Sequence, residues 1–157
     1  MICIRDQIRY QNVLSKRYEF HYSQMDEFMR EFLTEVKNTG GHPKDTLFYC
    51  INNVPREERL KVEFFLPVRE DYLQATGDMH FHSYFSIENM MSIRVTDKIE
   101  TSMEGAYAAL LHFMEEADLE QVTPPFHMIG QAEGNYFITV KIGYIEKQRE
   151  VLENGNQ

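Results

Sequence analysis

The stretch Leu60-Lys-Val-Glu-Phe-Phe-Leu-Pro-Val68 is the most informative part of the chain, because a single carboxylate interrupts a largely apolar strand. Side chains alternate between the two faces of a strand, so the stretch separates into two sets. One face carries Leu60, Val62, Phe64, Leu66 and Val68. The other carries Lys61, Glu63, Phe65 and Pro67. The first set predicts a core face, whereas the second suits either solvent or the wall of a ligand cavity.

The residues before this stretch predict a strand, a helix and a second strand. Ile8–Val13 is the first strand and Leu47–Ile51 the second, with a turn over 52–55 leading into 60–68. Ser23 is the expected N-cap of the helix between them, and Gly40-Gly41 ends it. The apolar stripe of that helix is Met25, Phe28, Met29, Phe32, Leu33 and Val36.

The second half of the chain predicts the same order of elements. Met91–Val95 is a strand, Thr101-Ser102 caps a helix, and Phe126–Ile129 is a short strand. Tyr136–Tyr144 then alternates as a final strand, and 79–85 is expected as an additional strand or crossover. The helix has an apolar side made of Met103, Tyr107, Leu110, Leu111 and Met114.

Strand, helix, strand, strand therefore occurs twice, which predicts an α+β fold with pseudo-twofold symmetry. Two helices are expected to pack on one face of an antiparallel sheet, because neither helix can bury its stripe alone. We expect a single domain over 1–145, with halves at about 8–68 and 84–145. A polar tail follows over 146–157.

Composition excludes several classes of function. The 157 residues carry a net charge of −9, which disfavours nucleic acid as a partner because phosphate binding needs clustered basic residues. The apolar runs are too short for a membrane span, and the N-terminus lacks the pattern of a secretion signal. We therefore expect a cytoplasmic protein. Cys3 and Cys50 have neither a metal nor a redox spacing, so both are expected as free thiols.

The duplicated plan resembles the GyrI-like superfamily, the effector-binding domains of bacterial multidrug-sensing activators and their stand-alone relatives. The resemblance rests on Glu63-Phe-Phe-Leu-Pro67-Val68, which matches a family strand reading Glu, three residues, Pro-Val. It also rests on Glu104-Gly-Ala-Tyr-Ala108 in the second helix. The chain departs from the family by ending its last strand with Ile142-Gly-Tyr144, by lacking tryptophan, and by having no attached DNA-binding domain. A transcription-activator role therefore does not carry over.

The resemblance implies a non-enzymatic protein that binds an amphipathic, cationic small molecule in a cleft between the two halves. Glu63 matches the position of the family's buried carboxylate, which pairs with the ligand's charge. Coulomb attraction and cation–π contacts would offset the cost of burying that carboxylate. The remaining candidate wall residues are Phe48, Phe65, Tyr136 and, on the helix, Tyr107.

Other interpretations of the same residues stay open. A strand glutamate beside Lys61 is often solvated and paired across the sheet. His80 and His82 could place two imidazoles on a metal, but no further ligand is identifiable, so we expect no metal and no other cofactor. Some stand-alone relatives are thought to be hydrolases, which leaves a weak hydrolase activity open. The alternative function is a protein-interaction module: an accessory, inhibitor or chaperone-like partner that meets a basic protein surface or forms a homodimer. An association with toxin operons would fit this alternative.

Overall fold

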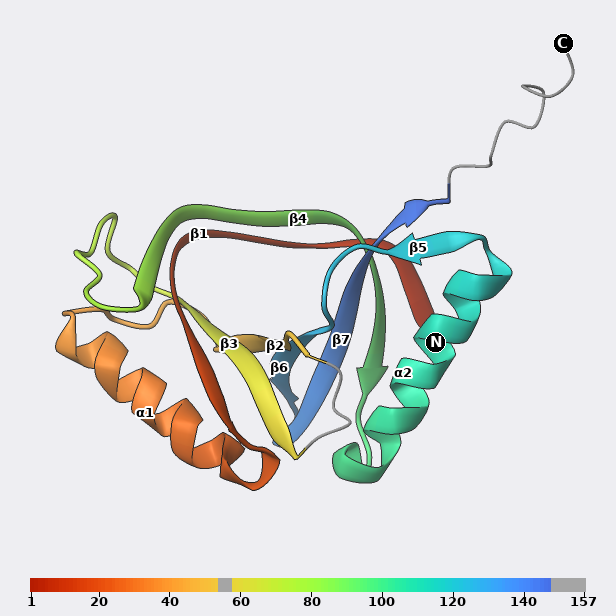
Figure 1. The fold of residues 1–157 in the computed structure, drawn as a ribbon, viewed down its shortest axis with the longest axis horizontal. Coiled ribbons are helices and arrows are strands. Elements are labelled where there is room, and N and C mark those ends of the chain that lie inside the picture. The colour runs from red at the N-terminus through yellow and green to blue at the C-terminus, as the bar shows by residue number, and fades with distance from the viewer. Residues whose placement is uncertain (54–57, 148–157) are drawn as a thin grey trace, which may run out of the picture.

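The computed structural model describes residues 1–53 and 58–147 (Figure 1). The turn expected over 52–55 lies partly outside the described residues, and so does most of the expected tail. The elements in order are β1 (Ile2–His21), the 3₁₀ helix η1 (Tyr22–Gln24), α1 (Met25–Asn38), β2 (Phe48–Ile51), β3 (Arg59–Pro67), β4 (Met79–Val95), α2 (Ile99–Glu116), β5 (Leu119–Gln121), β6 (Phe126–Ala132) and β7 (Asn135–Glu146). The elements follow the expected order along the chain, with the short strand β5 added after α2. The α+β fold predicted from the sequence is confirmed. The division into two halves stays a prediction.

The seven-stranded antiparallel sheet closes on itself. The strand order is β4-β1-β3-β2-β6-β7-β5, and β4 also pairs with β7, from Met90↔Gly143 to Val95↔Ile138. That additional pairing joins the two ends of the series β4-β1-β3-β2-β6-β7 into a ring. Closure gives the sheet an inside and an outside, and it removes most of the edges that an open sheet would expose.

β1 and β4 are much longer than the sequence analysis predicted. They run together as a two-stranded ribbon from Ile2↔Ile93 to Lys16↔Met79, which arches over the rest of the sheet (Figure 1). Each then bends down to join a second partner, β1 with β3 and β4 with β7. The prediction of two separate segments over 79–85 and 91–95 was wrong, because both belong to the single strand β4. Ser86, Glu88 and Asn89 hid the continuity, because this part of the ribbon packs on the inner cluster through one face only, with Phe85 and Ile87.

Both predicted helix caps were wrong. η1 precedes α1, so Ser23 lies in the 3₁₀ turn, where its hydroxyl contacts Nδ1 of His21 at 2.7 Å. α2 begins at Ile99, earlier than expected, after Lys98 in a left-handed conformation with φ 47°. The hydroxyl groups of Thr101 and Ser102 consequently donate back to the carbonyls of Lys98 and Asp97.

The outer face of β3 forms the core against α1, as the alternation predicted. Val62, Phe64 and Leu66 are at most 2% exposed and pack with Phe32 and Val36 of α1. On the other side of the molecule, α2 covers β4 and β7 through a separate cluster that includes Leu110, Met114 and Val140. The two helices thus flank the strands rather than contact one another (Figure 1).

The inner face of the ring is filled with aromatic side chains. Phe48 stacks on Phe65 at 4.9 Å between centroids and 6° between planes, and on Tyr10 at 5.5 Å. Phe85 and Phe126 tilt against the same pair. Phe48 is fully buried, so its ring is the centre of this inner cluster.

Two ion pairs lie between neighbouring strands near the inner cluster. Arg17 of β1 pairs in register with Glu63 of β3, and its Nε lies 3.3 Å from the carboxylate. Ser92 of β4 pairs in register with Lys141 of β7, and both side chains bond the carboxylate of Asp6, at 2.7 and 3.2 Å. Paired charged groups therefore accompany the apolar interior at both places.

A tyrosine and a histidine connect α2 to the outer face of the sheet. The hydroxyl of Tyr107 hydrogen-bonds Nε2 of His127 on β6, and the His127 ring stacks on Tyr49 of β2 at 4.6 Å. His127 is 1% exposed, and its Nδ1 has no partner among the described residues. Burial lowers the pKa of His127 to about 4, so the imidazole is neutral at pH 7.

Neither helix in the described part of the chain is long and apolar enough to cross a membrane.

Replacing Phe48 tests whether the ring of strands is packed. Phe48→Ala is expected to lower the free energy of unfolding by about 3–5 kcal/mol, because the cavity left in a packed aromatic cluster does not collapse. Chemical denaturation measures this. Tyr84→Ala, at a 53% exposed position of β4, serves as the control and is expected to change stability by less than about 0.5 kcal/mol. A loss below about 1 kcal/mol for Phe48→Ala would indicate a hollow interior.

The buried imidazole predicts an acid-sensitive fold. With a folded pKa of about 4 against an ordinary 6.5, the unfolded chain binds more protons at His127 between these two pH values. Stability is therefore expected to fall as the pH drops from 6.5 to 4, by up to roughly 3 kcal/mol from this residue. His127→Gln should flatten that slope in denaturation curves taken across this range, although burial of His82 retains part of it. His112→Gln, on an exposed helix face, should leave the slope unchanged; an unchanged slope in both variants would contradict the assignment.

Candidate functional site

A cleft lies between α1 and α2, over the outer face of the central strands. Its floor comes from alternate residues of β2, β6 and β7, since side chains two apart on a strand share a face. These floor residues are Tyr49, Ile51, Ile129, Ile138 and Ile142. His127 pairs with Tyr49 in the sheet but is itself buried. The Tyr107–His127–Tyr49 row crosses this floor and divides the cleft into two cavities.

The larger cavity, which we call the acidic cavity, has a volume of about 850 Å³. α1 contributes Met25, Asp26 and Met29, and α2 contributes Ile99 and Met103. Among the described residues that line it, Asp26 carries the only charge. Burial, with the charge of Asp26 nearby, raises the pKa of Tyr49 to about 12, so the phenol at the floor keeps its proton. The cavity therefore combines flexible thioethers, aromatic rings and one carboxylate, a set that suits a cation with an apolar body.

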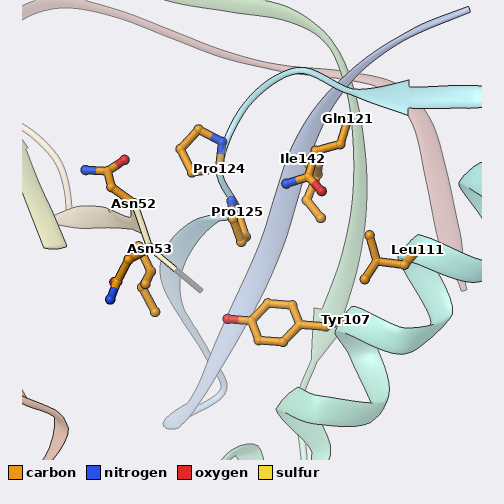
Figure 2. Close-up of a pocket in the computed structure, with 9 residues that line it drawn as sticks. Asn52, Asn53, Tyr107, Leu111, Gln121, Pro124, Pro125 and Ile142 are labelled. Atoms are coloured by element: carbon orange, nitrogen blue, oxygen red, sulfur yellow. The ribbon is translucent and has the colours of Figure 1, made fainter. Parts of the chain in front are cut away.

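The smaller cavity, which we call the amide cavity, has a volume of about 360 Å³ (Figure 2). Its rim carries three carboxamides, Asn52, Asn53 and Gln121. Its walls are otherwise apolar, with Ile51, Leu111, Pro124, Pro125 and Ile142. Figure 2 shows Tyr107 extending from α2 across its lower side. None of the described residues that line this cavity carries a charge.

The glutamate singled out from the sequence lies on the inner face of the ring. The side chain of Glu63 is 13% exposed and pairs with Arg17. Burial raises the pKa of the Cys50 thiol to about 12, and the nearby charge of Glu63 adds to this effect. Glu63 lines neither of the two cavities.

The other four predicted site residues are divided among three places. Phe48 and Phe65 share the inner face with Glu63 but stack on one another within the packed cluster. Tyr136, 64% exposed, lines the acidic cavity, and Tyr107 lines the amide cavity. The binding role of all five residues stays a prediction.

Sequence reasoning missed Asp26 and Tyr49 as cavity residues. An acid in the first turn of a helix is favoured by the helix dipole, which is a sufficient reason for Asp26 at that position. The available signal was its neighbours, because Met25 and Met29 place soft apolar side chains beside a carboxylate. Tyr49 alternates with Phe48 and Cys50 on a four-residue strand, too short for the pattern alone to assign a face.

No group of three or more His, Cys, Asp or Glu residues with the arrangement of a metal site occurs within 1–53 and 58–147. Nε2 of His82 instead lies 2.8 Å from the buried Ser15 hydroxyl, in a hydrogen bond across the β1–β4 ribbon.

Comparison with solved structures supports the fold. The chain is similar to EcmrR in a cryo-EM structure of its DNA complex, with a TM-score of 0.76, 16% identity, and coverage of 94% of this chain and 58% of that chain. It is similar to the EcmrR C-terminal domain, with a TM-score of 0.73, 14% identity, and coverage of 94% and 98%. A hydrolase from Listeria innocua is similar at a TM-score of 0.54 and 10% identity, with coverage of 91% and 90%.

These identities are low enough that the likeness concerns the fold alone. At that level the chain shares the fold of the EcmrR C-terminal domain, and the fold expected from the sequence is confirmed. The chain spans little more than half of the DNA-bound EcmrR chain. No curated protein matches the chain.

A family model covers nearly all of the described residues. The model for a domain of unknown function, DUF5085, matches residues 9–146, from β1 to the end of β7. This protein therefore belongs to the DUF5085 family.

Proposed function

We propose that this protein binds small amphipathic cations in the cleft between α1 and α2. The observation that carries the proposal is the acidic cavity, whose lining combines one carboxylate, the exposed Asp26, with methionine and aromatic side chains. Its volume of about 850 Å³ is within the range of pockets that hold drug-sized molecules. A cation placed there would gain Coulomb attraction from Asp26 and contact with the faces of Tyr49 and Tyr136.

Asp26 is the better candidate counter-ion because its charge is available. Among the described residues, no basic side chain forms a salt bridge with Asp26, whereas Glu63 pairs with Arg17. A ligand at Glu63 would have to compete with that guanidinium and displace packed aromatic rings. The net charge of −9 would further favour cations over anions.

We expect binding without chemical turnover. The cleft residues with acid–base chemistry are poorly suited to activating a nucleophile. Burial raises the pKa of Tyr107 and Tyr49, and His127 is neutral with no access to solvent. The thiol of Cys50 is likewise held protonated.

A protein-interaction role is the second candidate. Val122, directly after β5, is 52% exposed, and Ile145 on the neighbouring strand β7 is 47% exposed. Exposed apolar residues of this kind favour contact with a protein surface or a second copy of the chain. This role becomes the better account if the cleft binds no small cation.

A pair of neutral substitutions separates the two acidic candidates. Asp26→Asn is expected to weaken binding of a cationic dye, rhodamine 6G, about five- to tenfold, the loss typical of one partly solvated charge contact. Glu63→Gln should leave the affinity within about twofold, because its carboxylate is already paired. Fluorescence anisotropy measures both. Binding to the wild-type protein should also weaken with added salt, and binding to the Asp26 variant should lose most of that dependence.

Thermal unfolding controls for general damage in both variants. A loss of affinity confined to Glu63→Gln would contradict the assignment of Asp26 and favour the carboxylate predicted from the sequence. Absence of dye binding to the wild-type protein would overturn the proposal as a whole.

A further inference from the structure

The two cavities match opposite ends of one kind of molecule. The acidic cavity holds Asp26, whereas the described lining of the amide cavity is uncharged and largely apolar. A cationic head suits the first, and an uncharged arm suits the second. This inference rests on the proposed function of the cleft.

The cavities lie end to end. Met103 lines the acidic cavity, Tyr107 forms the partition, and Leu111 lines the amide cavity, at successive four-residue steps of α2. With a rise of 1.5 Å per residue, Met103 and Leu111 are roughly 12 Å apart along the helix. The floor repeats the order, since Tyr49 and Ile51 of β2 line the acidic and amide cavities respectively. A molecule about as long as two cavities could therefore lie straight along the cleft.

Two of the three carboxamides on the rim of the amide cavity are already bonded to the backbone. Asn53 donates through Nδ2 to the carbonyl of Arg59 and accepts from the backbone of Lys61. Nε2 of Gln121 donates to the carbonyl of Thr123. With these carboxamides held by the backbone, the cavity offers apolar surface, and an arm of hydrocarbon fits it better than a polar arm.

One side chain separates the cavities. Tyr107 reaches from α2 to the floor, where its hydroxyl bonds His127, and this is its one side-chain hydrogen bond among the described residues. His127 itself is fixed by burial and by its stack on Tyr49. A change of the Tyr107 rotamer would break that single bond and connect the two cavities without moving either strand or helix.

We infer that the two cavities form one site for a cation with an extended hydrocarbon arm, and that Tyr107 determines how long an arm the site accepts. The head lies beside Asp26, and the arm points along the cleft toward Leu111. Tyr107 is then a specificity-determining residue rather than a general wall of the site.

A series of dyes with one head and arms of increasing length tests this. The probes are 4-(4-dimethylaminostyryl)pyridinium cations with N-alkyl arms from methyl to octyl, followed by fluorescence titration. In the wild-type protein, the gain in affinity per added CH₂ is expected to stop once the arm reaches Tyr107. In Tyr107→Ala the gain should continue at about fourfold per buried CH₂. Tyr107→Phe, which keeps the ring but loses the bond to His127, should give an intermediate series.

Two further variants serve as controls. Phe113→Ala alters an aromatic residue of α2 that lines neither cavity and should leave the series as in the wild type. Leu111→Trp, added to Tyr107→Ala, fills the amide cavity and should abolish the additional gain from long arms while the methyl dye still binds.

The outcomes distinguish the two proposals. If the methyl dye binds the wild-type protein but the series is the same in wild type, Tyr107→Ala and Tyr107→Phe, the role of Tyr107 is overturned and the proposed function survives. If the methyl dye does not bind at all, the proposed function fails and the inference with it. Should Tyr107→Ala fail to fold, Tyr107→Phe alone and Tyr107→Phe with Leu111→Trp added decide the question.

Discussion

The pairing of β4 with β7 is the interaction on which the rest of the structure depends. Without it the strands would form an open, twisted sheet, and Phe48, Phe65 and Phe126 would face solvent. With it they face one another and form a packed interior. Closure also fixes which surface remains for a ligand. Because the inside is filled, the space for a guest lies outside the ring, between the two helices that cover separate parts of its outer face.

The alternation of residues 60–68 predicted one face of β3 correctly, because burial on the α1 side demands an uninterrupted apolar set. The opposite face was harder to interpret. Glu63 and Phe65 suggested either solvent or a cavity wall, and a closed sheet adds a third environment, a packed interior that ends in an ion pair. Closure arises from pairing between β4 and β7, which are distant in sequence, so local periodicity carries no signal for it.

The candidate site was less predictable than the fold for a related reason. Asp26 and Tyr49 become neighbours of α2 only after both halves have folded. In sequence, an acid in the first turn of a helix already has a local explanation, and so does a tyrosine in a strand. Family resemblance directed attention to a carboxylate on a strand, whereas in this chain the carboxylate that lines a cavity is on a helix. A methionine on each side of it was the one local sign of a different role.

The central claim is that the ring of strands is filled and that a ligand binds outside it. A crystal structure of the protein with rhodamine 6G tests this most directly. The account predicts density for the dye between α1 and α2, with its charged end beside Asp26 and the Phe48–Phe65 stack undisturbed. Density inside the ring, against Glu63 and between separated Phe48 and Phe65 rings, would contradict it.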